Sequence, residues 1–259
     1  MKINALTKYL TTTGIAFAGV VPALFAGPES LPNSSKDKNP IVEIPTAPRE
    51  GASLYASVNF RASFDHLESG GYNTVGAFHN TGSDDETNFS AGGAVGLAIP
   101  LKFGGTLRIE GEGISADMFN TVTNSFRPPT PTFFYKTKYS DRWAALANFW
   151  YDVPVWKCFG VYGGAGIGGG GSTISVNDGV VHGRGDSGDV VWQLGGGLTA
   201  TYKRLTLDVG YRYMDWGTNS VRLETIVGSV PAGTFSADVT SHQAFVAIRY
   251  AFFTNLFSR

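Results

Sequence analysis

The sequence predicts an all-β protein: an eight-stranded antiparallel up-and-down transmembrane β-barrel, preceded by a signal peptide and a short disordered tether. Three observations support this prediction. Segments of about ten residues alternate apolar and polar side chains, and a tilted strand needs this length to cross the hydrocarbon layer. Long and short connections between the segments alternate strictly, as they do in outer-membrane barrels. Aromatic side chains gather at both ends of the segments, where two membrane interfaces would lie.

The composition agrees with one large β-rich unit and excludes several other classes. The chain has 259 residues, of which 34 are glycine and 16% are charged, and its net charge is -1. Such a chain lacks the basic footprint of nucleic-acid binding, so we expect no nucleic-acid partner. No stretch has the ~18 apolar residues of a transmembrane helix, so any membrane-spanning part must be β. Cys158 is the only cysteine, so no internal disulfide can form.

The first fifty residues have the pattern of an export signal followed by a spacer. In residues 1–26, Lys2 and Lys8 precede the apolar run Gly14–Phe25, and Ala26 offers a small residue for cleavage, which predicts a signal peptide. Residues 27–50 contain five prolines and few apolar side chains. We therefore expect a disordered, Pro-rich periplasmic tether there, and a barrel over residues 51–259.

The first four predicted strands place apolar residues on one face and polar residues on the other. Two long loops, Asp65–Thr87 and Asp117–Tyr139, and the short turn Pro100–Gly104 connect them. In the third strand the apolar residues Ile114 and Ala116 predict a slip in phase at a glycine bulge. The apolar faces hold, in order, Leu54, Ala56, Val58, Phe60 and Ala62; Phe89, Ala91, Val95, Leu97 and Ile99; Leu107 and Ile109; and Trp143, Ala145, Ala147, Phe149 and Tyr151.

The last four predicted strands repeat the pattern. Their connections are the short turns Val153–Lys157 and Lys203–Arg204 and the long loops Gly170–Gly188 and Gly217–Thr240. An even number of strands places both termini on the side of the short turns. The apolar faces hold Phe159, Val161, Ala165 and Ile167; Trp192, Leu194, Leu198, Ala200 and Tyr202; Leu205, Leu207, Val209, Tyr211 and Tyr213; and Ala244, Val246, Ile248, Tyr250 and Phe252.

The opposite face of these strands predicts a lumen charge network, formed by Arg61, Arg108, Glu110, Glu112, Asp208, Arg212 and Arg249. Eight strands enclose a space just wide enough for side chains to fill. Buried charges of opposite sign must pair, because an isolated one costs several kcal/mol. We therefore expect a closed lumen instead of an open pore, and the same charges argue against a soluble carrier with an apolar interior.

Aromatic residues on the apolar faces predict two girdles at the membrane interfaces. Trp143, Trp192, Tyr211 and Tyr213 fall towards the long-loop end, and Tyr202, Tyr250 and Phe252 fall towards the short-turn end.

The segment Gly210–Gly217 reads Gly-Tyr-Arg-Tyr-Met-Asp-Trp-Gly, and the last strand ends Ile-Arg-Tyr-Ala-Phe. With these segments, residues Ser53–Phe252 resemble the small surface barrels of Gram-negative-type outer membranes, including the OmpA transmembrane domain and the opacity proteins. The resemblance implies an outer-membrane location with extracellular loops and periplasmic termini, with outer-membrane lipids and the barrel-assembly machinery as partners. In that family the closing aromatic is often the final residue, whereas here Phe253–Arg259 follow it.

Two further features bear on function. Arg184, Gly185 and Asp186 form an Arg-Gly-Asp tripeptide in a predicted loop, which offers a host or cell-surface contact; the alternative is a solvated loop. A lipid-modifying enzyme needs a nucleophile, a base and a carboxylate that converge, but adjacent Ser241 and His242 point to opposite faces of a strand. We expect no enzymatic activity, no cofactor and no metal. The expected role is structural or surface contact, with a small porin and a barrel-embedded lipid-modifying enzyme as alternatives.

Overall fold

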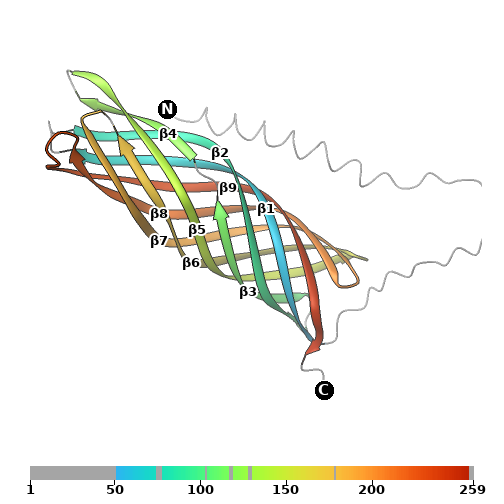
Figure 1. The fold of residues 1–259 in the computed structure, drawn as a ribbon. Helices are drawn as coiled ribbons and strands as arrows, with labels where there is room; N and C mark the ends of the chain where they lie inside the picture. The colour runs from blue at the N-terminus through green and yellow to red at the C-terminus, as the bar shows by residue number, and fades with distance from the viewer. Residues whose placement is uncertain are drawn as a thin grey trace, which may run out of the picture. The chain divides into compact units, whose positions relative to one another are not determined.

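The computed structural model describes residues 51–73, 78–102, 104–116, 119–127, 130–177 and 179–256. The predicted signal peptide and tether lie outside the described residues. The strands, drawn in Figure 1, are β1 (Ala52–Asn73), β2 (Phe78–Pro100), β3 (Thr106–Ala116), β4 (Phe119–Arg127), β5 (Thr130–Trp156), β6 (Phe159–Asn177), β7 (Val181–Tyr202), β8 (Leu205–Thr225) and β9 (Pro231–Leu256).

These strands form one closed ring. β3 and β4 share a single place in it, because each pairs with β2 on one side and with β5 on the other. The other strands pair antiparallel in sequence order, and β1 closes the ring by pairing with β9, with Val58 opposite Ile248. The ring therefore has eight antiparallel places, which confirms the predicted up-and-down barrel.

The prediction of four long loops is wrong, because most of each segment is strand. β5 has 27 residues and β9 has 26, far more than the predicted ten or so. Asp65–Thr87, for example, is largely a β1–β2 hairpin paired from Asp65↔Glu86 to Asn73↔Phe78. We call the strand residues within 65–87, 117–139, 170–188 and 217–240 the extension, and the remaining strand residues the belt half.

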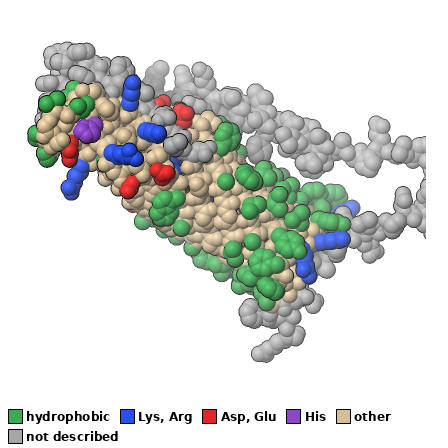
Figure 2. All heavy atoms as spheres, in the orientation of Figure 1, with side chains coloured by type: hydrophobic (Ala, Val, Ile, Leu, Met, Phe, Trp, Pro, Cys, Tyr) green, Lys and Arg blue, Asp and Glu red, His purple; other side chains and the backbone are tan. Residues whose placement is uncertain are grey.

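The belt half has the apolar outer face that the sequence predicts. Phe60 is 67% exposed and Val246 44%, although both are large apolar side chains. Figure 2 shows hydrophobic side chains gathered over this half, whereas the acidic side chains of the same face lie over the extension. Among the described residues, no helix is long and apolar enough to cross a membrane.

The expected slip in phase of β3 is also wrong. Glu112 and Ile114 both point inwards, and β3 pairs without a register shift to β2 and β5, with Glu112 opposite Leu146 and Ile114 opposite Ala144. The apolar residues change face because the interior changes along the barrel: it is charged around Glu112 and apolar from Ile114 towards the extension.

Bulges on β5 and β8 lie between the two halves. Asp141 (φ 53°) and Gly217 (φ 71°) have left-handed backbones and fall within register shifts of these strands. A Cβ at Gly217 would also lie 2.7 Å from a side-chain oxygen of Asp189, which accepts a hydrogen bond from the Thr218 amide at 2.9 Å. Glycine is therefore required there for both backbone conformation and space.

Candidate functional site

The lumen of the belt half is the most chemically organised part of the molecule. Strand alternation decides which side chains enter it, since every second residue points inwards. The structure places all seven residues of the predicted network inside, and each is at most 8% exposed: Arg61, Arg108, Glu110, Glu112, Asp208, Arg212 and Arg249.

Glu112 on β3 is the centre of the largest cluster. Its carboxylate binds Arg212 Nη1 on β8 at 2.9 and 3.0 Å, and it also binds Arg61 Nη2 on β1. Both arginines and the carboxylate are buried. The Arg212 contact joins β3 to β8 on the opposite side of the ring, and the Arg61 contact joins β3 to β1 across β2. Three amide side chains donate to the same carboxylate: Asn59 (2.9 Å), Asn148 (2.8 Å) and Gln193 (3.0 Å).

Glu110 lies one inward position away and binds mainly neutral donors. Tyr55 Oη donates to it at 2.6 Å, Trp150 Nε1 at 2.7 Å and Asn148 Nδ2 at 3.1 Å. Arg108 Nη1 is 3.7 Å from the same carboxylate. Asn148 thus connects the Glu110 and Glu112 clusters, since its amide donates to both.

A second ion-pair cluster lies near the short turns. Arg108 Nε donates to Asp152 Oδ1 at 3.0 Å, and Arg249 Nη1 lies 3.4 Å from Asp152 Oδ2. Arg249 also donates through Nη2 to Asp208 Oδ1 at 2.8 Å. This cluster fixes β3, β5, β8 and β9 to one another at the turn end of the lumen.

A third cluster marks the border with the extension. Asp65 Oδ2 accepts hydrogen bonds from Arg142 Nη1 at 2.6 Å and Asn88 Nδ2 at 2.9 Å, while its other oxygen accepts one from the Ser241 hydroxyl. The Arg142 guanidinium lies 4.5 Å from the centre of the Trp216 ring, an arrangement that favours a cation.

Sequence reasoning missed Asp65, Arg142 and Asp152 as members of the network. Asp65 falls within the predicted loop Asp65–Thr87, and the predicted lumen charge network includes neither Arg142 nor Asp152. Strand alternation gave a signal for the last two, because Arg142, Asn148 and Asp152 share one face of β5. With these additions, five arginines face five acids in the described lumen: Arg61, Arg108, Arg142, Arg212 and Arg249, with Asp65, Glu110, Glu112, Asp152 and Asp208.

Glycines and aromatic rings fill the space around these charges. A Cβ at Gly195 would lie 2.8 Å from Arg212 Cγ, and one at Gly92 would lie 3.2 Å from Arg61 Nη2. The inward glycines therefore leave room for the long arginine side chains. The Arg212 guanidinium also lies 4.1 Å from the Phe245 ring centre and 4.9 Å from that of Trp150.

In the extension the interior becomes an apolar core. Phe235, Ile174 and Val181 are fully buried there, and Leu67 is 1% exposed. Because this core spans the ring, the lumen is filled above the charges as well as at their level. The core also includes belt-half residues next to the border, namely Ile114, Ala144, Leu146, Val191, Met214 and Trp216. Its members in the extension are Leu67, Tyr139, Ile174, Val176, Val181, Val221, Leu223, Ala232, Phe235, Ala237 and Val239.

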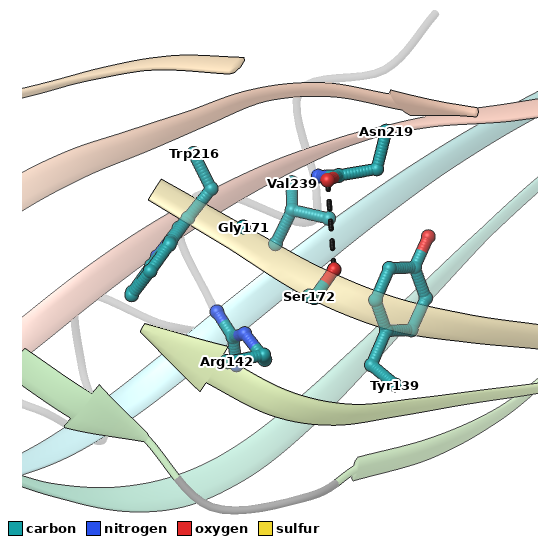
Figure 3. A pocket seen from close by; sticks show the side chains of 7 residues that line it. All are labelled: Tyr139, Arg142, Gly171, Ser172, Trp216, Asn219 and Val239. Carbon is teal, nitrogen blue, oxygen red and sulfur yellow. Dashed lines mark hydrogen bonds between the residues drawn. The ribbon is translucent and has the colours of Figure 1, made fainter. Parts of the chain in front are cut away.

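A cavity of about 10 Å³ lies where the core meets the charges (Figure 3). This is about the volume of a single water probe, so the cavity is no solute path. Ser172 donates to Asn219 across it at 3.5 Å. Burial raises the pKa of the Tyr139 phenol, although Arg142 opposes this, so the phenol is neutral at pH 7. The lining residues are Tyr139, Arg142, Gly171, Ser172, Trp216, Asn219 and Val239.

The predicted girdle residues lie on the outer face. Trp143 (54%), Trp192 (40%), Tyr211 (45%), Tyr202 (50%) and Tyr250 (49%) are exposed. Tyr213 and Phe252 are half-buried, because Tyr213 packs between Trp192 and His242 and Phe252 packs against Phe253.

The Arg-Gly-Asp tripeptide lies on strand β7, which corrects its predicted place in a loop. Pairing with β6 sets Arg184 opposite Ser175 and Asp186 opposite Thr173. Both charged side chains are exposed, but Thr173 Oγ1 donates to Asp186 Oδ1 at 2.7 Å. The tripeptide therefore has an extended backbone with its carboxylate already hydrogen-bonded.

The outer surface offers little for catalysis or metal binding in the part of the chain that the structure describes. No group of three or more His, Cys, Asp or Glu side chains there could hold a metal ion. Ser241 is buried with its hydroxyl on Asp65, whereas His242 is exposed beside Tyr211.

A closed antiparallel ring with an apolar outer belt and a charged lumen defines the class: a small β-barrel of the outer-membrane type. The sequence matches no protein-family model. It also matches no curated protein.

The fold is similar to that of several solved barrels. Neisserial surface protein A, NspA, is 16% identical over 78% of this chain and 100% of that chain, with a TM-score of 0.43. OprG from Pseudomonas aeruginosa is 13% identical over 78% and 98%, with a TM-score of 0.48. The attachment invasion locus protein Ail of Yersinia pestis is 11% identical over 78% and 99%, with a TM-score of 0.36. Such likeness concerns the fold alone.

Proposed function

We propose that this chain is an outer-membrane surface protein with a closed barrel, whose strands project beyond the membrane and present their turns for contact with other surfaces. The belt half supports the membrane location, because exposed Phe60, Val246 and their neighbours would be costly in water and suit hydrocarbon. The turns at the extension end would be extracellular, and both mature termini periplasmic, with the barrel-assembly machinery inserting the chain.

The filling of the lumen is the observation that supports a closed barrel. The charge clusters on Glu112 and Asp152 cross the ring in the belt half, and the Asp65 cluster crosses it at the border. The apolar core fills the ring from this border into the extension. A hydrated ion would have to displace both layers. The porin alternative needs a water path past both of them.

Single-protein recordings in planar bilayers test this proposal. We expect no steady conductance from protein whose folded state is verified by its heat-dependent mobility on gels. Regular conductance steps that scale with the number of inserted barrels would overturn the closed lumen and make the protein a small porin. A large-pore porin reconstituted in the same bilayers serves as the positive control for insertion.

The extension supports the surface-contact role. Its strands stay paired past the belt, beyond the register shifts at the border, so the barrel projects from the membrane as a paired structure. Arg184 and Asp186 are exposed on its outer face and remain a candidate contact. We expect no enzymatic activity, because the Ser241 hydroxyl is bound to Asp65 inside the ring.

A further inference from the structure

The outer face of β5, β6 and β7 has an amphipathic strip, of which the proposed function uses only Arg184 and Asp186 as a candidate contact. Most outward residues of β6 from Gly163 upwards are small, with Ile167 as the exception. The small residues are Gly163, Ala165, Gly169, Gly171, Thr173 and Ser175. The lower part of the strip is apolar, and its upper part is hydroxylic and basic.

The lower part is a groove of about 370 Å³. Its floor is Ala147 and Ala165, and its walls are Phe149, Ile167 and Leu194, with Trp192 at the upper end. All of these lie in the belt half, with Trp192 of the upper girdle at the top, so the groove faces hydrocarbon in the proposed orientation. An acyl chain is the occupant that fits an apolar groove at this depth.

The upper part gathers three cations over β6. Register places Lys138 opposite Ser175, and Ser175 opposite Arg184, while Lys136 is opposite Asn177. Neighbouring strands are about 4.8 Å apart, so Lys138 and Arg184 stand about 10 Å apart across Ser175. All three cations are exposed and point outwards.

These cations are available to an external anion. Among the described residues, the salt bridges include none of Lys136, Lys138 and Arg184. Asp186, the acid nearest to Arg184 on its own strand face, is held by Thr173 at 2.7 Å. Three like charges together attract phosphate groups more strongly than any one alone.

The spacing between groove and cations selects the kind of lipid. Ala165 and Ser175 are ten positions apart on β6, so about 33 Å of strand separates them. At a tilt of about 40° this is about 25 Å of height. In one leaflet a phospholipid spans about 15 Å of hydrocarbon and about 5–7 Å of headgroup layer, together about 20–22 Å, which is less than this height. A phospholipid whose chain lies in the groove therefore cannot reach the cations, whereas a headgroup of several sugar rings can.

We propose that this strip binds a phosphorylated glycolipid of the outer leaflet: an acyl chain lies in the groove, and sugar phosphates bind Lys136, Lys138 and Arg184. Thr173 and Ser175 would hydrogen-bond the sugars between them. This inference rests on the proposed membrane location, and it adds a specific lipid partner to it.

The test compares lipid-dependent stability of the mature chain in vesicles of zwitterionic phosphatidylcholine, with and without lipopolysaccharide whose core sugars are phosphorylated. We expect lipopolysaccharide to raise the urea concentration at which half of the wild-type protein is unfolded. The triple variant Lys136→Gln/Lys138→Gln/Arg184→Gln should need about a hundredfold more lipopolysaccharide for the same rise, because each of the three surface cations adds about fivefold in affinity. Ala165→Phe, which fills the groove, should show a comparable loss.

Matched controls separate the alternatives. Lys102→Gln/Lys157→Gln/Arg204→Gln removes three exposed cations at the turn end and should respond as the wild type does. Dephosphorylated lipopolysaccharide, phosphatidylglycerol and inorganic phosphate should each give no comparable rise. An equal rise with phosphatidylglycerol or free phosphate, or an unchanged response of the triple variant, would overturn the glycolipid site. Failure of the wild type to insert into any vesicle would instead overturn the membrane location.

Discussion

The two halves of the barrel are built from the same strands and place their apolar side chains on opposite faces. In the belt half, Val246 and Ile248 face outwards while Arg249 and Gln243 are buried. In the extension of the same strand, Phe235 is buried. Along β6 the inward positions keep one alternation, whereas on β5 and β8 the bulges shift it by one residue, from Tyr139 to Arg142 and from Trp216 to Asn219. Across this border the chemistry of the two faces is exchanged.

With the membrane location that we propose, the exchange follows from the medium outside the ring. Lipid cannot hydrogen-bond, so the belt half turns apolar residues outwards and satisfies its buried charges internally. Where water surrounds the ring, the hydrophobic effect favours the reverse arrangement, as in a soluble protein. The Asp65 cluster lies where the two arrangements meet.

The largest expected effect comes from breaking the charged interior at Glu112. Glu112→Ala leaves Arg61 and Arg212 buried without their carboxylate, so we expect a loss of about 3–5 kcal/mol in unfolding free energy, and values near the top of this range. Urea titration of the folded protein in vesicles measures it. Glu224→Ala, an exposed acid of the extension, is the control, and equal losses in both variants would contradict the Glu112 cluster.

Breaking the apolar interior should cost slightly less and act locally. Phe235→Ala leaves a cavity in the core of the extension, with an expected loss of about 3–4 kcal/mol. Limited proteolysis should then cut the β8–β9 hairpin beyond the belt while the belt half stays protected. If the protease cut the belt half and the extension of β8 and β9 equally, the variant would not have destabilised the extension locally.

Substitutions on the outward face of β9 also distinguish the belt half from the extension. Val246→Arg places a cation near the middle of the belt, where it costs about 2–4 kcal/mol in a membrane. Thr234→Arg, on the outward face of the same strand in the extension, should cost less than about 0.5 kcal/mol. Equal folding yields of the two variants in liposomes would contradict the assignment of belt and extension.

The smallest effect is expected at the exposed tripeptide. Asp186→Glu keeps the charge and should change stability by less than about 0.5 kcal/mol. We also expect unaltered attachment of cells that display the protein to host cells. Loss of attachment with an unchanged fold would assign an adhesive role to Arg184, Gly185 and Asp186.

The belt half was predicted well from the sequence, because the alternation there places apolar residues on the outward face of every strand. Apolar residues such as Val58 and Phe60 lie on one face, and Arg61 lies on the other, as a lipid-facing strand requires. In the extension the strands still alternate, but the apolar residues lie on the inward face and the polar residues on the outward face. Val221 and Leu223 are inward apolar residues between outward Ser220, Arg222 and Glu224, and such segments look like polar loops if the apolar face is sought outside.

The partners within the lumen were only partly predictable. Alternation identifies which residues point inwards, but it does not show which strands face one another across the ring. Glu112 lies 100 positions before Arg212, and only the closed register brings them within 2.9 Å. Asp65 was not predicted to point into the lumen, because the first predicted strand stops before it.

The most direct test of the two-part barrel is a scan of spin labels along the outward face of β9. Single cysteines at Ile248, Val246, Ala244, Thr240, Asp238 and Ser236, in a Cys158→Ser background, would be labelled and measured in bilayers for collision with oxygen and with a water-soluble nickel complex. We expect labels from Ile248 to Ala244 to collide mainly with oxygen, and labels from Thr240 to Ser236 to collide mainly with nickel. A lipid-like signal at Asp238, or a water-like signal at Val246, would contradict the exchange of faces between the belt half and the extension.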